Sequence, residues 1–157
     1  MKIGGLDPTT LPVEEVLVLP RGDQQIVFRA TGLKDMETFK KVCPEPEPPR
    51  KLVKGGATVA DIEDKGYQDA LADYHKRRIA YIVVHSLRPS EIEWDTVQLD
   101  NPSTWGNWEA DLKNAGLSEI ECSRVLALVL EANCLDEAKL RKARELFLRG
   151  TPAAPVA

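Results

Sequence analysis

The sequence contains two histidines that could act in catalysis or bind a metal, His75 and His85. They are ten positions apart on one predicted helix, which separates them by about 280° around its axis at about 100° per residue. Ligands of a single zinc ion must converge on it, so this pair is not expected to bind metal. We expect both histidines to be solvated or packed against a neighbouring helix, and we predict no metal site.

Pairs of carboxylates are the other possible source of chemistry. Glu91 and Glu93 flank Ile92, whereas Glu119 and Glu121 open a predicted helix, where the helix dipole favours acidic side chains. The P-loop, the glycine motif of dinucleotide-binding folds and the G-x-S-x-G elbow are absent. We therefore predict no cofactor and no enzymatic activity. A small enzyme with an unrecognised acid pair is the alternative.

Charge and hydropathy exclude some classes of partner. The 157 residues include 21 Lys and Arg against 25 Asp and Glu, a formal net charge of −4, which argues against a general nucleic-acid binder. Basic clusters at residues 75–78 and on the last predicted helix are either solvated faces or docking sites for an acidic partner. The longest apolar run, residues 125–130, is far shorter than the roughly 20 residues of a membrane span. We predict neither nucleic acid nor membrane as a partner.

The first third of the chain predicts a β-hairpin and a linker. Residues 16–19 and 26–28 are short apolar runs separated by turn-forming residues, and a short helix is expected at 34–42. Two strands alone are marginally stable, so the hairpin must pack on a helix or on a neighbouring subunit. Four prolines within residues 44–49 exclude a helix there, and with the following glycines they predict a linker over 44–58.

The remainder of the chain predicts helices. Capping residues at Asn101, Ser118 and Asp136 mark three helix starts. The helices are expected at residues 58–65, 67–87, 102–115, 118–133 and 136–148. The apolar run at 125–130 indicates a central helix. On the last helix we expect three side chains to face inward, Leu140, Ala143 and Phe147.

These elements predict an α+β protein, mainly α, with an N-terminal β-hairpin, a Pro-rich linker and a bundle of four or five helices. The expected division is 1–43 for the hairpin and short helix, 44–58 for the linker, 59–150 for the helical domain and 151–157 for a flexible tail.

Six short motifs follow one another in the C-terminal two-thirds of the chain: IAYI at 79–82, EW at 93–94, WGNW at 105–108, AGLS-x-x-E at 115–121, EAN-x-LDE at 131–137 and ARE-x-FL at 143–148. In this order they resemble small tail assembly chaperones of long-tailed bacteriophages, over about residues 67–150. The resemblance implies a helical, non-enzymatic protein of the host cytoplasm. Such a protein keeps the tape-measure protein soluble and helps to recruit tail-tube subunits.

A holder of this kind needs apolar surface for another polypeptide, and aromatic side chains are common hot spots of such surfaces. From residue chemistry, not from the family, we take four candidate protein contacts: Trp94, Trp105, Trp108 and Phe147. The tryptophans could instead fill the core between helices. The hairpin and the Pro-rich segment could serve self-association through an open strand edge. The alternative function is a structural virion or adaptor protein of a phage particle.

Overall fold

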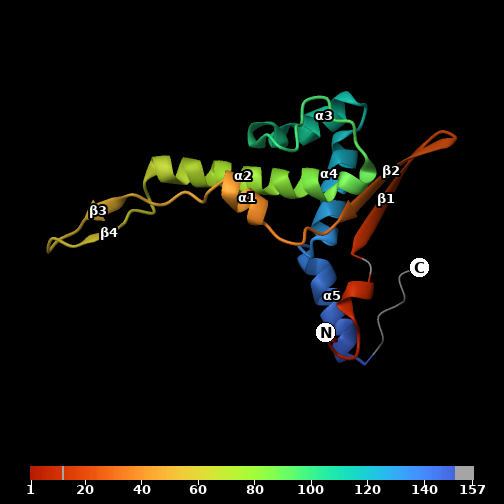
Figure 1. Cartoon of the computed structure of the whole chain (residues 1–157), viewed down its shortest axis with the longest axis horizontal. Helices are drawn as coiled ribbons and strands as arrows, with labels where there is room; N and C mark the ends of the chain where they lie inside the picture. Colours follow the sequence, from red (N-terminus) through yellow and green to blue (C-terminus); the bar gives the residue numbers. More distant parts are fainter. Residues whose placement is uncertain (12, 151–157) are drawn as a thin grey trace. The chain divides into compact units, whose positions relative to one another are not determined.

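The structure of the chain is a computed structural model that describes residues 1–11 and 13–150 (Figure 1). It confirms the predicted fold class, α+β with an N-terminal β-hairpin followed by about five helices. The tail predicted at 151–157 lies outside the described residues.

The chain forms two compact units, each built from segments that are distant in the sequence. Unit 1 comprises Met1–Leu33, Ser86–Ile92 and the chain from Leu117 onward, and unit 2 comprises Lys34–His85 and Glu93–Gly116. This division cuts across the boundaries expected from the sequence. The reason is that the N-terminal hairpin of unit 1 packs against a helix that begins only at residue 119.

The N-terminal hairpin of unit 1 consists of two antiparallel strands, β1 (Glu14–Arg21) and β2 (Gln24–Thr31), in the register that places Leu17 opposite Phe28. A single 3₁₀ turn, η1 (Pro8–Thr10), precedes them. The apolar runs predicted as strands therefore pair with each other, as the turn-forming residues between them indicated.

One face of this hairpin is covered within unit 1. Leu19, Phe28 and Ala30 are buried, whereas Val18 and other alternate residues are exposed, as expected for a half-covered sheet. The helix α4 (Glu119–Ala132) contacts both strands (Figure 1). This packing supplies the partner that an isolated two-stranded hairpin lacks.

The outer edge of β2 is closed by a side chain from the 3₁₀ turn η2 (Arg88–Ser90). The Ser90 hydroxyl accepts a hydrogen bond from Arg29 N at 2.7 Å and donates one to Arg29 O at 2.7 Å. One hydroxyl thus satisfies both edge-facing backbone groups of Arg29, which would otherwise be open to another strand.

Asn133, at the C-terminal end of α4, connects three segments of unit 1. Its Oδ1 accepts from Leu33 N at 2.8 Å, and its Nδ2 donates to Ser86 Oγ at 2.9 Å and to Val129 O at 2.8 Å. Close packing accompanies these bonds, because Gly32 passes directly against the Ala132 carbonyl. The side chain of Asn133 therefore fixes the hairpin exit and residue 86 at the end of α4.

The two C-terminal helices begin where the capping residues indicated. Ser118 and Glu121 form the predicted capping box at the start of α4. The second helix, α5 (Glu137–Leu148), is capped by Asp136, whose side chain accepts from Lys139 N at 3.2 Å. The side of α4 that carries Cys122, Val125 and Val129 is buried, but Ala127 is exposed, so α4 is not enclosed on every side.

Unit 2 is organised by an aromatic cluster on the long helix α2 (Lys65–Ser86). The ring of Phe39, on the short helix α1 (Glu37–Val42), lies with its centroid 5.4 Å from those of both Tyr74 and Tyr81. The C-terminal part of α2 is buried, whereas its charged first half is mostly exposed. These contacts fix α1 against α2 (Figure 1).

Two sequence predictions for unit 2 are wrong. The short helix expected at 58–65 is absent; instead β4 (Thr58–Ala60) pairs antiparallel with β3 (Arg50–Leu52), so the segment expected as a linker contains a strand. The side chain of Arg50 donates to Thr58 O at 2.7 Å across this pair. The glycines at 55 and 56 have positive φ, because they form the turn of a small hairpin.

The segment predicted as one helix at 102–115 has two parts, a 3₁₀ helix η3 (Pro102–Asn107) and the helix α3 (Trp108–Asn114). On α3, the buried carboxylate of Asp111 accepts hydrogen bonds from Thr96 N at 2.9 Å, Thr96 Oγ1 at 2.7 Å and Val97 N at 3.2 Å. Burial raises the pKa of the Asp111 carboxyl, but these hydrogen bonds outweigh it and hold the pKa below its ordinary value.

Candidate protein-binding surface

The three tryptophans expected as protein contacts all belong to unit 2, and two of them are core residues. Trp105 is 2% exposed, its ring centroid lies 5.0 Å from that of Tyr81, and its Nε1 donates to Leu99 O at 3.0 Å. Trp108 is also buried, at 8% exposed, whereas Trp94 is half-buried. Trp105 and Trp108 therefore offer almost no surface to a partner while unit 2 stays folded, and Trp94 retains some.

Phe147, the fourth candidate, lies in unit 1 on α5 and is 80% exposed. The expectation that Leu140, Ala143 and Phe147 face inward is wrong, because no residue of α5 is buried. Their spacing does place them on one side of the helix, and all three side chains are exposed there. We call the surface formed by Leu140, Ala143 and Phe147 the α5 face.

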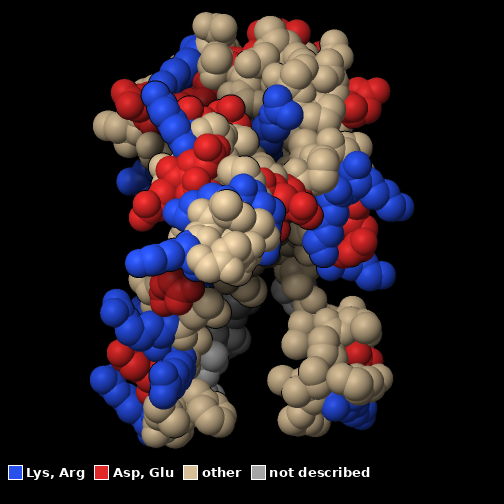
Figure 2. All heavy atoms as spheres, turned by 90° about the vertical axis from the view of Figure 1, so that its left-hand side faces the viewer, with Lys and Arg blue, Asp and Glu red and all other residues tan. Residues whose placement is uncertain are grey.

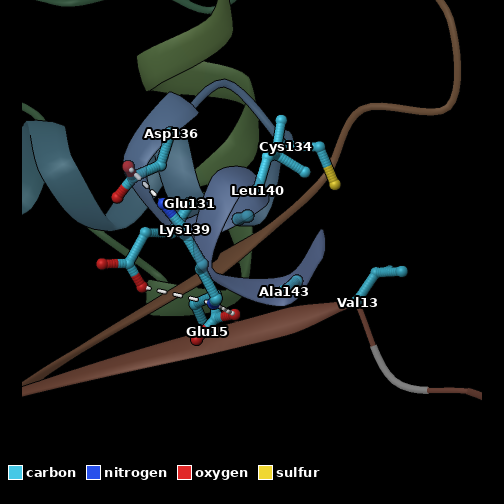
Figure 3. A pocket seen from close by; sticks show the side chains of 9 residues that line it. Val13, Glu15, Glu131, Cys134, Asp136, Lys139, Leu140 and Ala143 are labelled. Carbon is cyan, nitrogen blue, oxygen red and sulfur yellow. Dashed lines mark hydrogen bonds and ion pairs between the residues drawn. The ribbon is translucent and has the colours of Figure 1, made fainter. Parts of the chain in front are cut away.

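A pocket of about 230 Å³ lies at the N-terminal end of the α5 face. Its apolar lining comes from Val13, just before β1, from Ala132 at the end of α4, and from Leu140 and Ala143 on α5. Figure 3 shows Val13, Leu140 and Ala143 arranged around this space. The pocket makes the apolar surface concave at this end, a shape that suits an inserted side chain.

Charged side chains border the same pocket and are paired with one another. Lys139 Nζ lies 2.9 Å from Glu15 Oε1 on β1 and 3.6 Å from Glu131 Oε2 on α4 (Figure 3). The hydrogen bond to Glu15 is the main reason that the pKa of Lys139 lies above its ordinary value. Both carboxylates thus face a cation, an arrangement that anchors α5 to β1 and α4.

The remaining basic residues of α5 are uncompensated. Within the described part of the chain, ion pairs with Asp or Glu are absent for three of them, Arg141, Lys142 and Arg144, and for Arg149, which directly follows the helix. Figure 2 shows Lys and Arg side chains, with a few Asp and Glu among them, at the lower left, at the height of α5 in Figure 1. The α5 face is therefore apolar along its centre and positively charged beside it.

Both histidines lie on α2, and both have ring contacts with tyrosines of unit 2, His75 with Tyr74 at 5.5 Å between centroids. His75 is exposed, whereas the His85 ring centroid lies 4.2 Å from that of Tyr81 and 5.8 Å from that of Trp105. Among residues 1–11 and 13–150, no three His, Cys, Asp or Glu side chains are grouped so as to hold a metal ion. Within the same residues, no helix combines the length and the apolar character that crossing a bilayer requires.

Sequence reasoning missed the residues that build the pocket around α5. Val13 and Glu15 are more than a hundred positions away from Lys139, and no local pattern indicates that they meet. For α5 itself a signal was present, because a helix with a narrow apolar stripe among many charges is typical of a helix that binds a partner.

Comparison of the chain with protein-family models, curated proteins and solved structures finds no match.

Proposed function

We propose that this chain is a phage tail assembly chaperone that binds an amphipathic helical segment of the tape-measure protein on the α5 face. In this role it keeps the tape-measure protein soluble and helps to recruit tail-tube subunits. The observation that carries the proposal is the state of α5: no residue of the helix is buried, and Phe147 is 80% exposed. The choice of the tape-measure protein as the partner rests on the sequence resemblance over about residues 67–150.

The geometry of the α5 face fits a helix as the bound segment. The 12 residues of α5 extend about 18 Å, which corresponds to about three turns of a partner helix lying alongside. Burial of Phe147 would stabilise the complex by about 1.5–3 kcal/mol, before the cost of association. Burial of Leu140 would contribute less, because this side chain is only 45% exposed in the free chain. A long helical protein with apolar stripes aggregates when these stripes are bare, so covering them keeps it in solution.

The test is co-expression with a candidate tape-measure protein, using two matched variants. Phe147→Ser removes the largest and most exposed side chain of the α5 face, and Leu52→Ser on β3 removes a similarly exposed side chain, at 74%, from unit 2. We expect a soluble, co-purifying tape-measure protein with the unmodified chain and with Leu52→Ser, and an aggregated one with Phe147→Ser. Aggregation with all three chains would overturn the proposal.

A structural virion or adaptor protein is the second candidate, and the β3–β4 hairpin favours it. All residues of both strands are exposed, so this hairpin could pack against a neighbouring subunit in an assembled particle. Quantitative mass spectrometry of purified mature particles separates the two functions. A chaperone is absent from the particle, whereas a structural protein is present in a fixed copy number.

A further inference from the structure

The charges around the α5 face carry information about the chemistry of its partner. Three basic residues of α5, and Arg149 directly after it, have no ion-pair partner among the described residues, and the helix itself contains only Glu137 and Glu145 as acids. The whole chain has a formal net charge of −4, so this positive region has the opposite sign to the protein that carries it. A local reversal of charge beside an exposed apolar stripe favours an acidic partner.

Position on the helix separates the basic residues that border the apolar stripe from those that do not. Arg144 follows Leu140 by four residues and precedes Phe147 by three, so it is a surface neighbour of both. Lys142 is two residues from Leu140 and five from Phe147, which places it on the other side of α5. Arg144 is therefore next to the α5 face, whereas Lys142 lies on the other side of the helix and serves as a basic control residue.

The other border of the α5 face is already neutralised. Lys139 lies there, and its ammonium group faces Glu15 and Glu131. Arg144 is thus the cation beside the stripe that remains available to a ligand. We infer that the helix bound on the α5 face carries an acidic side chain next to its own apolar stripe, and that this carboxylate pairs with Arg144.

This inference rests on the proposed function and adds the chemistry of the bound segment to it. A basic amphipathic helix also suits the surface of an anionic membrane. The end of the α5 face that contains the pocket does not suit an anionic membrane, because it is concave and bordered by the carboxylates of Glu15, Glu131 and Asp136. A partner helix can place its acidic residue over Arg144 alone, whereas a flat anionic bilayer would approach these carboxylates as well.

The experiment measures binding of two synthetic helical peptides to the full chain by fluorescence anisotropy. Both peptides have about 18 residues and the same apolar stripe, and they differ only in carrying Glu or Lys beside it. We expect the acidic peptide to bind at least about fivefold more tightly, with the preference weakened by salt. Arg144→Glu should weaken acidic-peptide binding by about fivefold or more, and Lys142→Glu by less than about twofold.

The outcomes separate this inference from the proposed function. Equal binding of both peptides, lost in Phe147→Ser, would overturn the role of Arg144 and leave helix docking on the α5 face in place. Equal effects of Arg144→Glu and Lys142→Glu would also overturn it, since only bulk charge would then matter. Binding of neither peptide, or binding instead to phosphatidylglycerol vesicles that requires Arg144, would overturn the inference, and co-expression would still decide the function.

Discussion

The ammonium group of Lys139 on α5 lies 2.9 Å from the carboxylate of Glu15 on β1, although the two residues are 124 positions apart. Lys139 is also 3.6 Å from Glu131 on α4, so one cation connects three elements of unit 1. This ion pair is a direct contact between the hairpin and α5, and it positions the helix that carries the α5 face.

The first prediction concerns the strength of this contact. In a double-mutant cycle with Glu15→Gln and Lys139→Met, we expect a coupling of only about 0.2–1 kcal/mol in the free energy of unfolding, because both side chains are partly solvent-exposed. The pKa of Lys139 is raised, so its contribution is complete at neutral pH and is lost as the pH rises above about 10.4. Urea unfolding at low and high salt measures the coupling, and a value that does not fall with salt would contradict the assignment.

The second prediction concerns Asp111, the buried carboxylate that holds the loop before η3. Both carboxylate oxygens of Asp111 accept hydrogen bonds from Thr96 and Val97, but the amide of Asp111→Asn has only one oxygen and an NH₂ group that cannot accept. We therefore expect the free energy of unfolding to fall by about 1–3 kcal/mol at pH 7. Asp100→Asn is the control, because Asp100 is exposed. Urea unfolding monitored by tryptophan fluorescence provides the measurement.

Low pH should remove the contribution of the Asp111 carboxylate to the free energy of unfolding. The pKa of Asp111 is below its ordinary value of 3.8 in the folded chain, so the stabilisation is present above that value and is lost as the pH falls through the lowered pKa. The difference in unfolding free energy between the native chain and Asp111→Asn should therefore shrink as the pH falls below about 4. A difference that stays constant over this interval would show that the carboxylate is not the group responsible.

The third prediction concerns close packing at Gly32. A methyl group at this position would lie 2.5 Å from the Ala132 carbonyl oxygen, so the end of α4 or the hairpin exit must shift to admit it. We expect Gly32→Ala to destabilise unit 1 by about 1–3 kcal/mol. Gly106→Ala is the matched control, because no atom lies within 4 Å of the added methyl group there. If thermal unfolding shows equal midpoints for the two variants, the packing at Gly32 is looser than described.

Local signals in the sequence predicted the starts of helices well. The capping box at Ser118, the cap at Asn101 and the cap at Asp136 each depend on residues two or three positions away, and each is formed as expected. The hairpin β1–β2 was equally accessible, since its turn residues separate two apolar runs. Such features depend on short-range chemistry, which a single sequence displays directly.

Long-range features were not accessible in this way. The Ser90 hydroxyl that closes the β2 edge is 61 positions from Arg29, and no periodicity relates them. The spacing of Leu140 and Phe147 correctly indicated a shared face, but it cannot say whether the fold covers that face. The segment at 50–60 was misjudged for a different reason: Gly55 and Gly56 favour a hairpin turn as much as a flexible linker.

The last prediction contrasts two aromatic residues that the sequence placed in one class of candidate contacts. Phe147→Ser should change the free energy of unfolding by less than about 0.5 kcal/mol, because the side chain is 80% exposed. Trp105→Ala should cost about 3–5 kcal/mol, because it leaves a cavity beside Phe39 and Tyr81 and removes the hydrogen bond to Leu99 O. Urea unfolding followed by far-ultraviolet circular dichroism measures both changes without relying on tryptophan emission. Because a surface that awaits a partner contributes to binding and not to folding, a large loss of stability in Phe147→Ser would mean that α5 is covered within the chain, and the proposed docking surface would be lost with it.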